Sequence, residues 1–516
     1  MLNLVPLPDK RITYKKGRGD TRYVYYTLRA YRNERGQPTS DEMSIGKLDN
    51  ETGMLIPNRN YFELFPDQAP PTAVLSLGLL AVFSDIAQRV GLTETLSAVF
   101  SEEHTRTILS LASYMLAEGN VMMGYPDWYD AHVKKDLVAL SSQEISRFFA
   151  QITEHERSAF FEMWSRKYLN NDYIVYDVTS ISTYSEQDGR AERGYNRDGE
   201  KLAQINLGLH YGQNSRMPLL YRVYSGSIVD KSYFPAMLAH CQVLRLENVR
   251  FVMDQGMLTE DNIKLVVEEG YSALCSLSAH LKLYKSLLSQ VIQTPFSSRE
   301  YLSSLELYGR SIDADYFGIP IKVHFYYDQE KAAVEEKSLY ADIERKREEL
   351  GLLQKQKKLK PSQSKYFRVE AMGQRELDFE LDYEKIDALK TKLGYFALFS
   401  TDLNISAEEA LTLYRNKDVV EKAFDQLKNG LDYRRMRTHH VQSTEGKLFV
   451  AFVSLIVRCT MLQLIKADPE IKKTTLKQAV GQLERIQELH GRNKAQLLTL
   501  TKKQKQILKA LKVELG

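Results

Sequence analysis

Cysteine is scarce in this chain, which has three among its 516 residues. Cys241, Cys275 and Cys459 lie far apart without Cys-x-x-Cys spacing, so the sequence indicates neither a disulfide framework nor a structural zinc site. Long hydrophobic runs are also lacking. The N-terminal MLNLVPLPDKR has no apolar signal core, and the longest apolar run, near Leu448 to Val457, is too short to span a bilayer. We therefore expect a soluble, cytoplasmic protein with no membrane partner.

An excess of charge of one sign is absent too. The chain has 70 Lys and Arg against 67 Asp and Glu, a formal net charge of +3. A nucleic-acid surface must therefore come from local clustering of basic residues. The length allows several domains with a large core, and the hydrophobic fraction of 43% is ordinary for a globular protein.

Changes in periodicity along the chain predict six segments. Residues 1–66 alternate as short strands do, and residues 67–167 have the spacing of short helices. Residues 168–285 and 395–470 alternate strands with helices, on either side of an insertion at 286–394 that contains a charged helix. Residues 471–516 are predicted to form basic helices. We therefore expect an α/β core with an insertion domain, a β-rich N-terminal element and a helical module.

Several of these segments are candidates for DNA contact. The N-terminal element interleaves basic residues with five tyrosines, as a DNA-facing sheet would, although an exposed face of a small sheet explains this equally well. The helical module 67–167 and the basic tail are further candidates, and the cluster from Lys355 to Arg368 is a weaker one. The basic residues of the N-terminal element are Arg11, Lys15, Lys16, Arg18, Arg22, Arg29, Arg32 and Arg35.

Two acids are predicted to end strands of the α/β core. In NDYIVYDVTSIST the apolar strand Tyr173 to Val178 ends around Asp177, and in VRFVMDQGM a second apolar strand ends at Asp254. Capping of the following turn is the commoner role of a single strand-end Asp. Two such acids in one sheet are more costly to bury unless a cation compensates them.

A third acid lies in LTLYRNKDVVEKAFDQLK, Leu411 to Lys428, which we predict to be one amphipathic helix. At about 100° per residue, Tyr414, Glu421 and Lys428 lie along one edge of its apolar face, because they are seven residues apart. Lys417 joins the same line. A solvated salt-bridge stripe is the alternative reading of this edge. Together, Asp177, Asp254 and Glu421 predict a hard-oxygen site suited to Mg²⁺ or Mn²⁺, with two ions able to serve a phosphoryl displacement.

With these residues the chain resembles DDE transposases of bacterial insertion sequences, in the group with a YREK signature. Tyr414, Lys417, Glu421 and Lys428 stand at the signature positions, with lysine in place of arginine at 417. Lysine keeps the charge but lacks the bidentate geometry of arginine. The segments YDVTSIST, MDQGM, SGSIVDK and IGKLDNETGMLIPNR also match this group, although Gln255 follows Asp254 where a basic residue is frequent.

The resemblance implies an RNase H-like catalytic core and a homodimer bound to the terminal inverted repeats of the element. It implies metal-dependent cleavage at the element ends, followed by attack of the 3′-hydroxyl on target DNA. Asp177, Asp254 and Glu421 are then the catalytic metal ligands, and a nucleoid-associated location follows. The alternatives are an RNase H-like nuclease without strand transfer and a catalytically inactive DNA-binding relative. The implied DNA contacts are Tyr414, Lys417, Lys428, Arg434, Arg435 and Arg437.

Overall fold

Two structural units divide the chain in the computed structural model. The first comprises residues 1–91, 102–145 and 461–516, and the second comprises residues 92–101 and 146–460. The structure describes residues 4–17, 19–33, 35–65, 73–169, 172–247, 249–257, 259–356, 358, 366–372, 376–490 and 495–515. Arg18 and most of the stretch between Lys355 and Arg368 therefore lie outside the described residues.

The N-terminal element forms an antiparallel sheet in the order β1 (Ile12–Lys16), β2 (Arg22–Arg32), β3 (Pro38–Leu48) and β4 (Leu55–Pro57). Helix α1 (Arg59–Leu64) packs on it, and Val24, Ile45, Leu55 and Tyr61 form the small buried core. On this sheet Lys15 pairs with Glu42 at 3.0 Å and lies over the ring of Tyr25. The alternation of the sequence is thus explained by one buried and one polar face.

The rest of the first unit is mainly helical. It contains α2 (Gly78–Arg89), α4 (Glu102–Glu118), α5 (Tyr125–Asp130), α16 (Leu476–Leu483) and α17 (Lys502–Leu511). A three-stranded sheet joins distant parts of the chain, because β18 (Gln487–His490) pairs with both β19 (Ala495–Leu497) and β5 (Ala73–Ser76). The spacing of the tail predicted helices throughout, but part of the tail forms strands. These strands form through pairing with a segment about 400 residues away.

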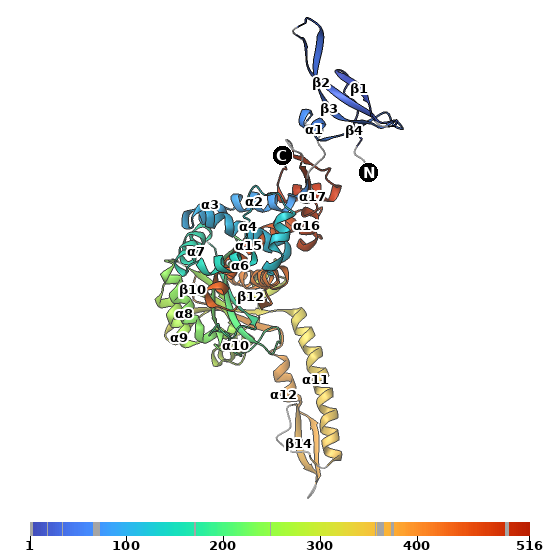
Figure 1. The fold of residues 1–516 in the computed structure, drawn as a ribbon. Helices are drawn as coiled ribbons and strands as arrows, with labels where there is room; N and C mark the ends of the chain where they lie inside the picture. The colour runs from blue at the N-terminus through green and yellow to red at the C-terminus, as the bar shows by residue number, and fades with distance from the viewer. Residues whose placement is uncertain are drawn as a thin grey trace. The chain divides into compact units, whose positions relative to one another are not determined.

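The second unit is built on a ten-stranded mixed sheet (Figure 1). Strands β6 (Ile174–Thr183), β7 (Ala203–Gly212) and β8 (Pro218–Ser225) form an antiparallel meander. On the other side of β6, β9 (Arg250–Met253) and β10 (Ser272–Leu277) run parallel to it. Strands β16 (Tyr395–Ser400), β13 (Ile319–Tyr327), β12 (Leu307–Tyr316) and β11 (Tyr301–Leu302) extend the sheet, and β17 (Arg435–Met436) pairs with the end of β6.

Helices accompany this sheet, which confirms the predicted α/β class. Figure 1 shows α8 (Asp230–Val243), α9 (Glu260–Glu268) and α10 (Lys282–Gln293) beside the strands. The unit also holds α3 (Leu92–Val99), α7 (Glu154–Tyr168) and the end of α6 (Ser142–Gln151). Thr153 caps α7 through a capping box with Glu156, which fixes where this helix begins.

Helix α15 (Val441–Ala467) is the most apolar element of the chain. Among the described residues it is the one helix long and apolar enough to cross a membrane, and 78% of its most apolar window is buried inside the protein. In the second unit, Phe449 lies against the rings of Phe100, Phe160 and Phe161 at centroid distances of 5.5, 5.1 and 6.1 Å. Its hydrophobicity is therefore that of a core helix.

Part of residues 286–394 leaves the sheet. Strands β11 to β13 of this range pair into the sheet, whereas α11 (Gln329–Lys355), β14 (Phe367–Met372), β15 (Glu376–Leu381) and α12 (Tyr383–Lys390) form a separate hairpin-and-helix structure. Its own core contains Ile343, Leu350, Tyr366, Phe367 and Ile386. Arg368 is paired with Asp382 and Glu384, at 3.3 and 2.8 Å.

Candidate active site

The sequence predicted that Asp177 ends a strand, but in the structure it lies inside β6. The strand continues to Thr183 because the polar residues after Asp177 pair with β7 over the whole length of β6. The Asp177 side chain is half-buried, and its Oδ1 accepts a hydrogen bond of 2.7 Å from the backbone N–H of Val178. Burial raises the pKa of Asp177, and the nearby charges of Arg197 and Lys417 oppose this rise. A cation therefore stabilises the ionised form here.

Asp254 lies on the neighbouring parallel strand, directly after Met253 at the end of β9. Val175 is paired with Val252, so Asp177 and Asp254, each two residues further on, stand level on the two neighbouring strands. The Asp254 side chain is 57% exposed, in contrast to that of Asp177. The sheet thus brings the first two predicted acids together.

The predicted helix from Leu411 to Lys428 is broken in the structure. It consists of α13 (Ala407–Arg415), α14 (Asp418–Asp425) and a π-helical turn, η6 (Gln426–Gly430). At the break, Val419 and Val420 donate to the carbonyls of Asn416 and Lys417 three residues earlier, at 3.3 and 3.2 Å. Single-helix spacing therefore does not hold from Tyr414 to Lys428.

The break changes where each signature residue lies. Tyr414 ends up half-buried on α13 beside Ser276 of β10, and burial raises the pKa of its phenol. Glu421 stays exposed on α14. Lys428, in the π-helical turn, is buried to 7% exposure. Non-local contacts accompany two of these positions, because Tyr414 meets Ser276 of β10 and Lys428 contacts Asp198 of the loop after β6.

Lys417, at the break, lies among the three acids. Its ammonium donates to Oδ1 of Asp254, and it interacts electrostatically with both Asp177 and Glu421. Burial lowers the pKa of Lys417, whereas Asp177 and Glu421 raise it. The ammonium also lies 5.3 Å from the centroid of the Tyr414 ring. Arginine at this position would be larger and forked; a lysine reaches the acids as a single point charge.

The acids are a suitable donor set for a hard divalent cation. Carboxylate oxygens are the ligands that Mg²⁺ and Mn²⁺ prefer. In the arrangement described, no group of three or more His, Cys, Asp or Glu side chains among the residues that the structure covers is close enough to hold a metal. Lys417 supplies the compensating positive charge instead. The three carboxylates fit a hard cation in kind, and in this arrangement their charge is met by Lys417.

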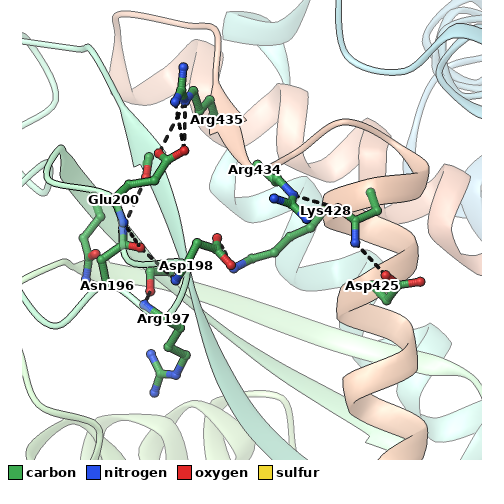
Figure 2. A network of polar contacts seen from close by, with 12 residues as sticks. Asn196, Arg197, Asp198, Glu200, Asp425, Lys428, Arg434 and Arg435 are labelled. Carbon is green, nitrogen blue, oxygen red and sulfur yellow. Dashed lines mark hydrogen bonds and ion pairs between the residues drawn. The ribbon is translucent and has the colours of Figure 1, made fainter.

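Three of the remaining predicted DNA contacts, Lys428, Arg434 and Arg435, belong to the polar network that Figure 2 shows. Lys428 contacts Asp198 at 2.6 Å, and Arg435 contacts Glu200 and the hydroxyl of Tyr184. Arg434 donates to Asn429 at 2.7 Å. Arg437 pairs with Asp432 at 3.2 Å.

Sequence reasoning missed the acceptors of this network. Asp198 and Glu200 belong to the turn 196–200, which also carries Arg197 toward Asp177. The segment NRDGE has the composition of a turn, but nothing in it indicates which cations it meets. Arg435 holds the pKa of Glu200 below its usual value by hydrogen bonding.

The order of the strands around β6, in a large mixed sheet that continues beyond the inserted segment, is consistent with an RNase H-like α/β fold. Residues 171–457 match the transposase DDE domain family. Since this match covers more than half of the chain, the protein belongs to that family.

The other comparisons add less. A cryo-EM structure of the piggyBac transposase synaptic complex with hairpin DNA is similar at 10% sequence identity, with a TM-score of 0.37; the match covers 77% of this chain and 70% of that one. No curated protein sequence matches the chain.

Proposed function

We propose that this transposase cleaves DNA at the ends of an insertion sequence and joins the freed ends to target DNA. The observation that carries the proposal is the convergence of Asp177, Asp254 and Glu421 on the ammonium of Lys417. Three acids around one cation are costly to maintain unless the cluster serves binding or catalysis. The family match supports a transposase in general terms.

In this proposal Asp177, Asp254 and Glu421 hold Mg²⁺ or Mn²⁺, two ions in each active site. When bound, such ions activate the attacking oxygen and stabilise the leaving oxygen of an in-line phosphoryl displacement. Water attacks the scissile phosphorus first, and the 3′-oxygen leaves. The 3′-hydroxyl then attacks a phosphorus of target DNA in the same kind of displacement. The chain's part is to hold Asp177 and Asp254 level on neighbouring strands, with Glu421 brought near them by α14.

The cations around the acids would position the DNA. Lys428 would hold a phosphate near the scissile bond, and Tyr414 one near the end of the strand. Lys417 would turn from the acids to the DNA backbone once metal replaces its charge. Further phosphate contacts are assigned to Arg434, Arg435 and Arg437, whose exposed, planar guanidinium groups can donate two hydrogen bonds to one phosphate.

The partners follow from the reaction. The terminal inverted repeats of the element and the target DNA are the proposed substrates, bound by a homodimer that holds two ends at once. The N-terminal sheet and the helical segment 67–167 are the proposed readers of the ends. In a cell the protein would be associated with the nucleoid.

A reconstituted reaction tests the proposal. Inverted repeats found in the DNA that flanks the gene would supply the substrate, and cleaved and joined products would be separated on a denaturing gel. We expect Asp177→Asn, Asp254→Asn and Glu421→Gln each to lower both products more than about 100-fold, the upper range for loss of a residue that merely supports a metal ligand. End binding should remain. Asp418→Asn, an exposed acid of the same helix paired with Lys422, is the matched control and should remain active.

Two other results would show that this chain has a different function. Cleavage without any joined product would indicate a nuclease of the same fold. Excision that persists in the Asp177→Asn variant would show that the acids are not catalytic, and the chain would then be a DNA-binding relative.

A further inference from the structure

One short turn presents two acids to two cations of the proposed DNA surface (Figure 2). Asp198 Oδ2 accepts from Lys428 Nζ at 2.6 Å. Two residues further on, Glu200 accepts from Nε and Nη2 of Arg435, at 3.2 and 2.9 Å to Oε1 and at 3.3 Å from Nε to Oε2. The second contact has the forked form in which arginine binds carboxylates and phosphates alike.

The turn is held in place by its backbone and by Asn196. Oδ1 of Asn196 accepts from the backbone N–H groups of Asp198 and Glu200, at 2.9 and 3.2 Å. Its Nδ2 donates to Ser182, and the N–H of Arg197 donates to Ser180. The start of the turn is therefore anchored to β6. Because these anchors do not involve the carboxylate of Asp198, that group is fixed by the turn and is replaceable without loss of the anchors.

The ion pair between Lys428 and Asp198 is largely buried, so Lys428 cannot keep this pair and bind a DNA phosphate at the same time. The side chain of Lys428 is 9% exposed, and that of its partner Asp198 is 23% exposed. A DNA phosphate therefore reaches the ammonium of Lys428 only if Asp198 gives up its place. Arg435 is more accessible, with 47% of its side chain exposed, but Glu200 holds its guanidinium fork.

We propose that the carboxylates of Asp198 and Glu200 occupy the places of DNA phosphates, and that DNA binds here by displacing these two carboxylates from Lys428 and Arg435. This inference rests on the proposed function, which makes DNA the ligand of Lys428 and Arg435. The surface is then a strand-binding site in which internal anions compete with the substrate. Binding exchanges a carboxylate for a phosphate at each cation. Each cation therefore contributes less to the free energy of DNA binding than a cation without a carboxylate partner would.

The inference predicts that a substitution removing negative charge from the turn strengthens DNA binding. We expect Asp198→Asn to raise the affinity for DNA by up to about fivefold, the upper limit that a partly exposed ion pair represents. Glu200→Gln should raise it similarly through Arg435. Glu162→Gln is the control, because it removes the same charge from a pair with Arg166 on α7.

A second background separates competition from a general effect of charge. Binding would be followed by fluorescence anisotropy of the full chain with a labelled duplex of arbitrary sequence, at one salt concentration. In the Lys428→Met background, Asp198→Asn should no longer change the affinity, because the cation for which the anions compete is gone. Thermal melts of each variant show that it is folded, and Glu200→Gln tested against Arg435→Met repeats the comparison if one variant fails.

The outcomes are distinct for the two proposals. Loss of the Asp198→Asn effect in the Lys428→Met background supports competition. An equal effect in both backgrounds, or one no larger than that of Glu162→Gln, overturns it and leaves the proposed function standing. Wild-type protein that binds no DNA at all overturns both.

Discussion

The ammonium of Lys417 donates a hydrogen bond to the carboxylate of Asp254, across 163 residues of sequence. Lys417 also interacts electrostatically with Asp177 and Glu421, so one ammonium group offsets negative charge on all three acids. Lys417 makes this contact from the break between α13 and α14, directly before the first residue of α14. We interpret Lys417 as the positive charge that holds the acids together before metal binds.

Replacing Lys417 with methionine should therefore make stability depend on metal. In EDTA we expect Lys417→Met to be less stable by about 1 kcal/mol, the upper range for a partly exposed pair, because three carboxylates then face one another with less compensating positive charge. Addition of Mg²⁺ or Mn²⁺ should raise the melting temperature of the variant more than that of the wild type. Differential scanning fluorimetry with and without metal measures both effects.

The matched control is Lys422→Met on α14, whose partner Asp418 lies one turn away at 2.6 Å. This variant should respond to metal as the wild type does. Equal metal responses of Lys417→Met and Lys422→Met would contradict the compensating role of Lys417.

Lys447 gives a prediction for pH. It is 2% exposed on α15, and burial, with help from the charge of Arg437, lowers its pKa to about 7. In the unfolded chain a lysine titrates near 10.4, so between these values the unfolded state binds more protons than the native state. Stability should therefore rise as the pH increases from about 7 toward 10.

Lys447→Met removes this dependence. We expect the variant to be at least as stable as the wild type at pH 7, because it no longer buries an ammonium group, and to show a flatter pH profile. Urea denaturation at several pH values measures it. Lys466→Met, on an exposed part of the same helix, should leave the profile unchanged. A loss of stability in Lys447→Met at pH 7 would mean that the ammonium is compensated in the native state.

Local pattern predicted much of the fold but little of the site geometry. The strand and helix order around Asp177 and Asp254 follows from apolar periodicity, and the α/β class with it. The extent of β6 beyond Asp177 does not, because its polar second half is a strand through pairing with β7. The same holds for β18, which forms by pairing with β5 at the other end of the chain.

The candidate site shows the same limit. Residue types at seven-residue spacing singled out Tyr414, Glu421 and Lys428, but the spacing assumed an unbroken helix. At the break, Lys417 contacts Asp254, and in the π-helical turn Lys428 contacts Asp198. Both partners lie far away in the sequence. Periodicity contains no information on such contacts.

The packing of α15 provides a test of stability in the second unit. Phe449 is fully buried and touches three aromatic rings. Phe449→Ala should lower the free energy of unfolding by about 3–5 kcal/mol through lost contacts and the cavity left behind. Met163→Ala on α7, where the side chain is 44% exposed, should cost much less. Similar losses in chemical denaturation would contradict the assignment of Phe449 to the core.

Lys428 gives the most direct test of the DNA surface. If its ammonium neutralises one phosphate in the complex, Lys428→Ala should weaken binding at low salt. The slope of log K against log salt concentration should fall by about 1, since one fewer counterion is released from DNA. Anisotropy titrations over a series of salt concentrations measure this slope.

Lys422→Ala serves as the control for Lys428→Ala, because Lys422 is an exposed cation of the adjoining helix that is already paired with Asp418 within that helix. Its slope should match that of the wild type. An unchanged slope for Lys428→Ala would place Lys428 outside the phosphate contacts. Its pairing with Asp198 would then be a structural link between the π-helical turn and the turn 196–200, because a buried ion pair that never exchanges its acid for a phosphate contributes no counterion release.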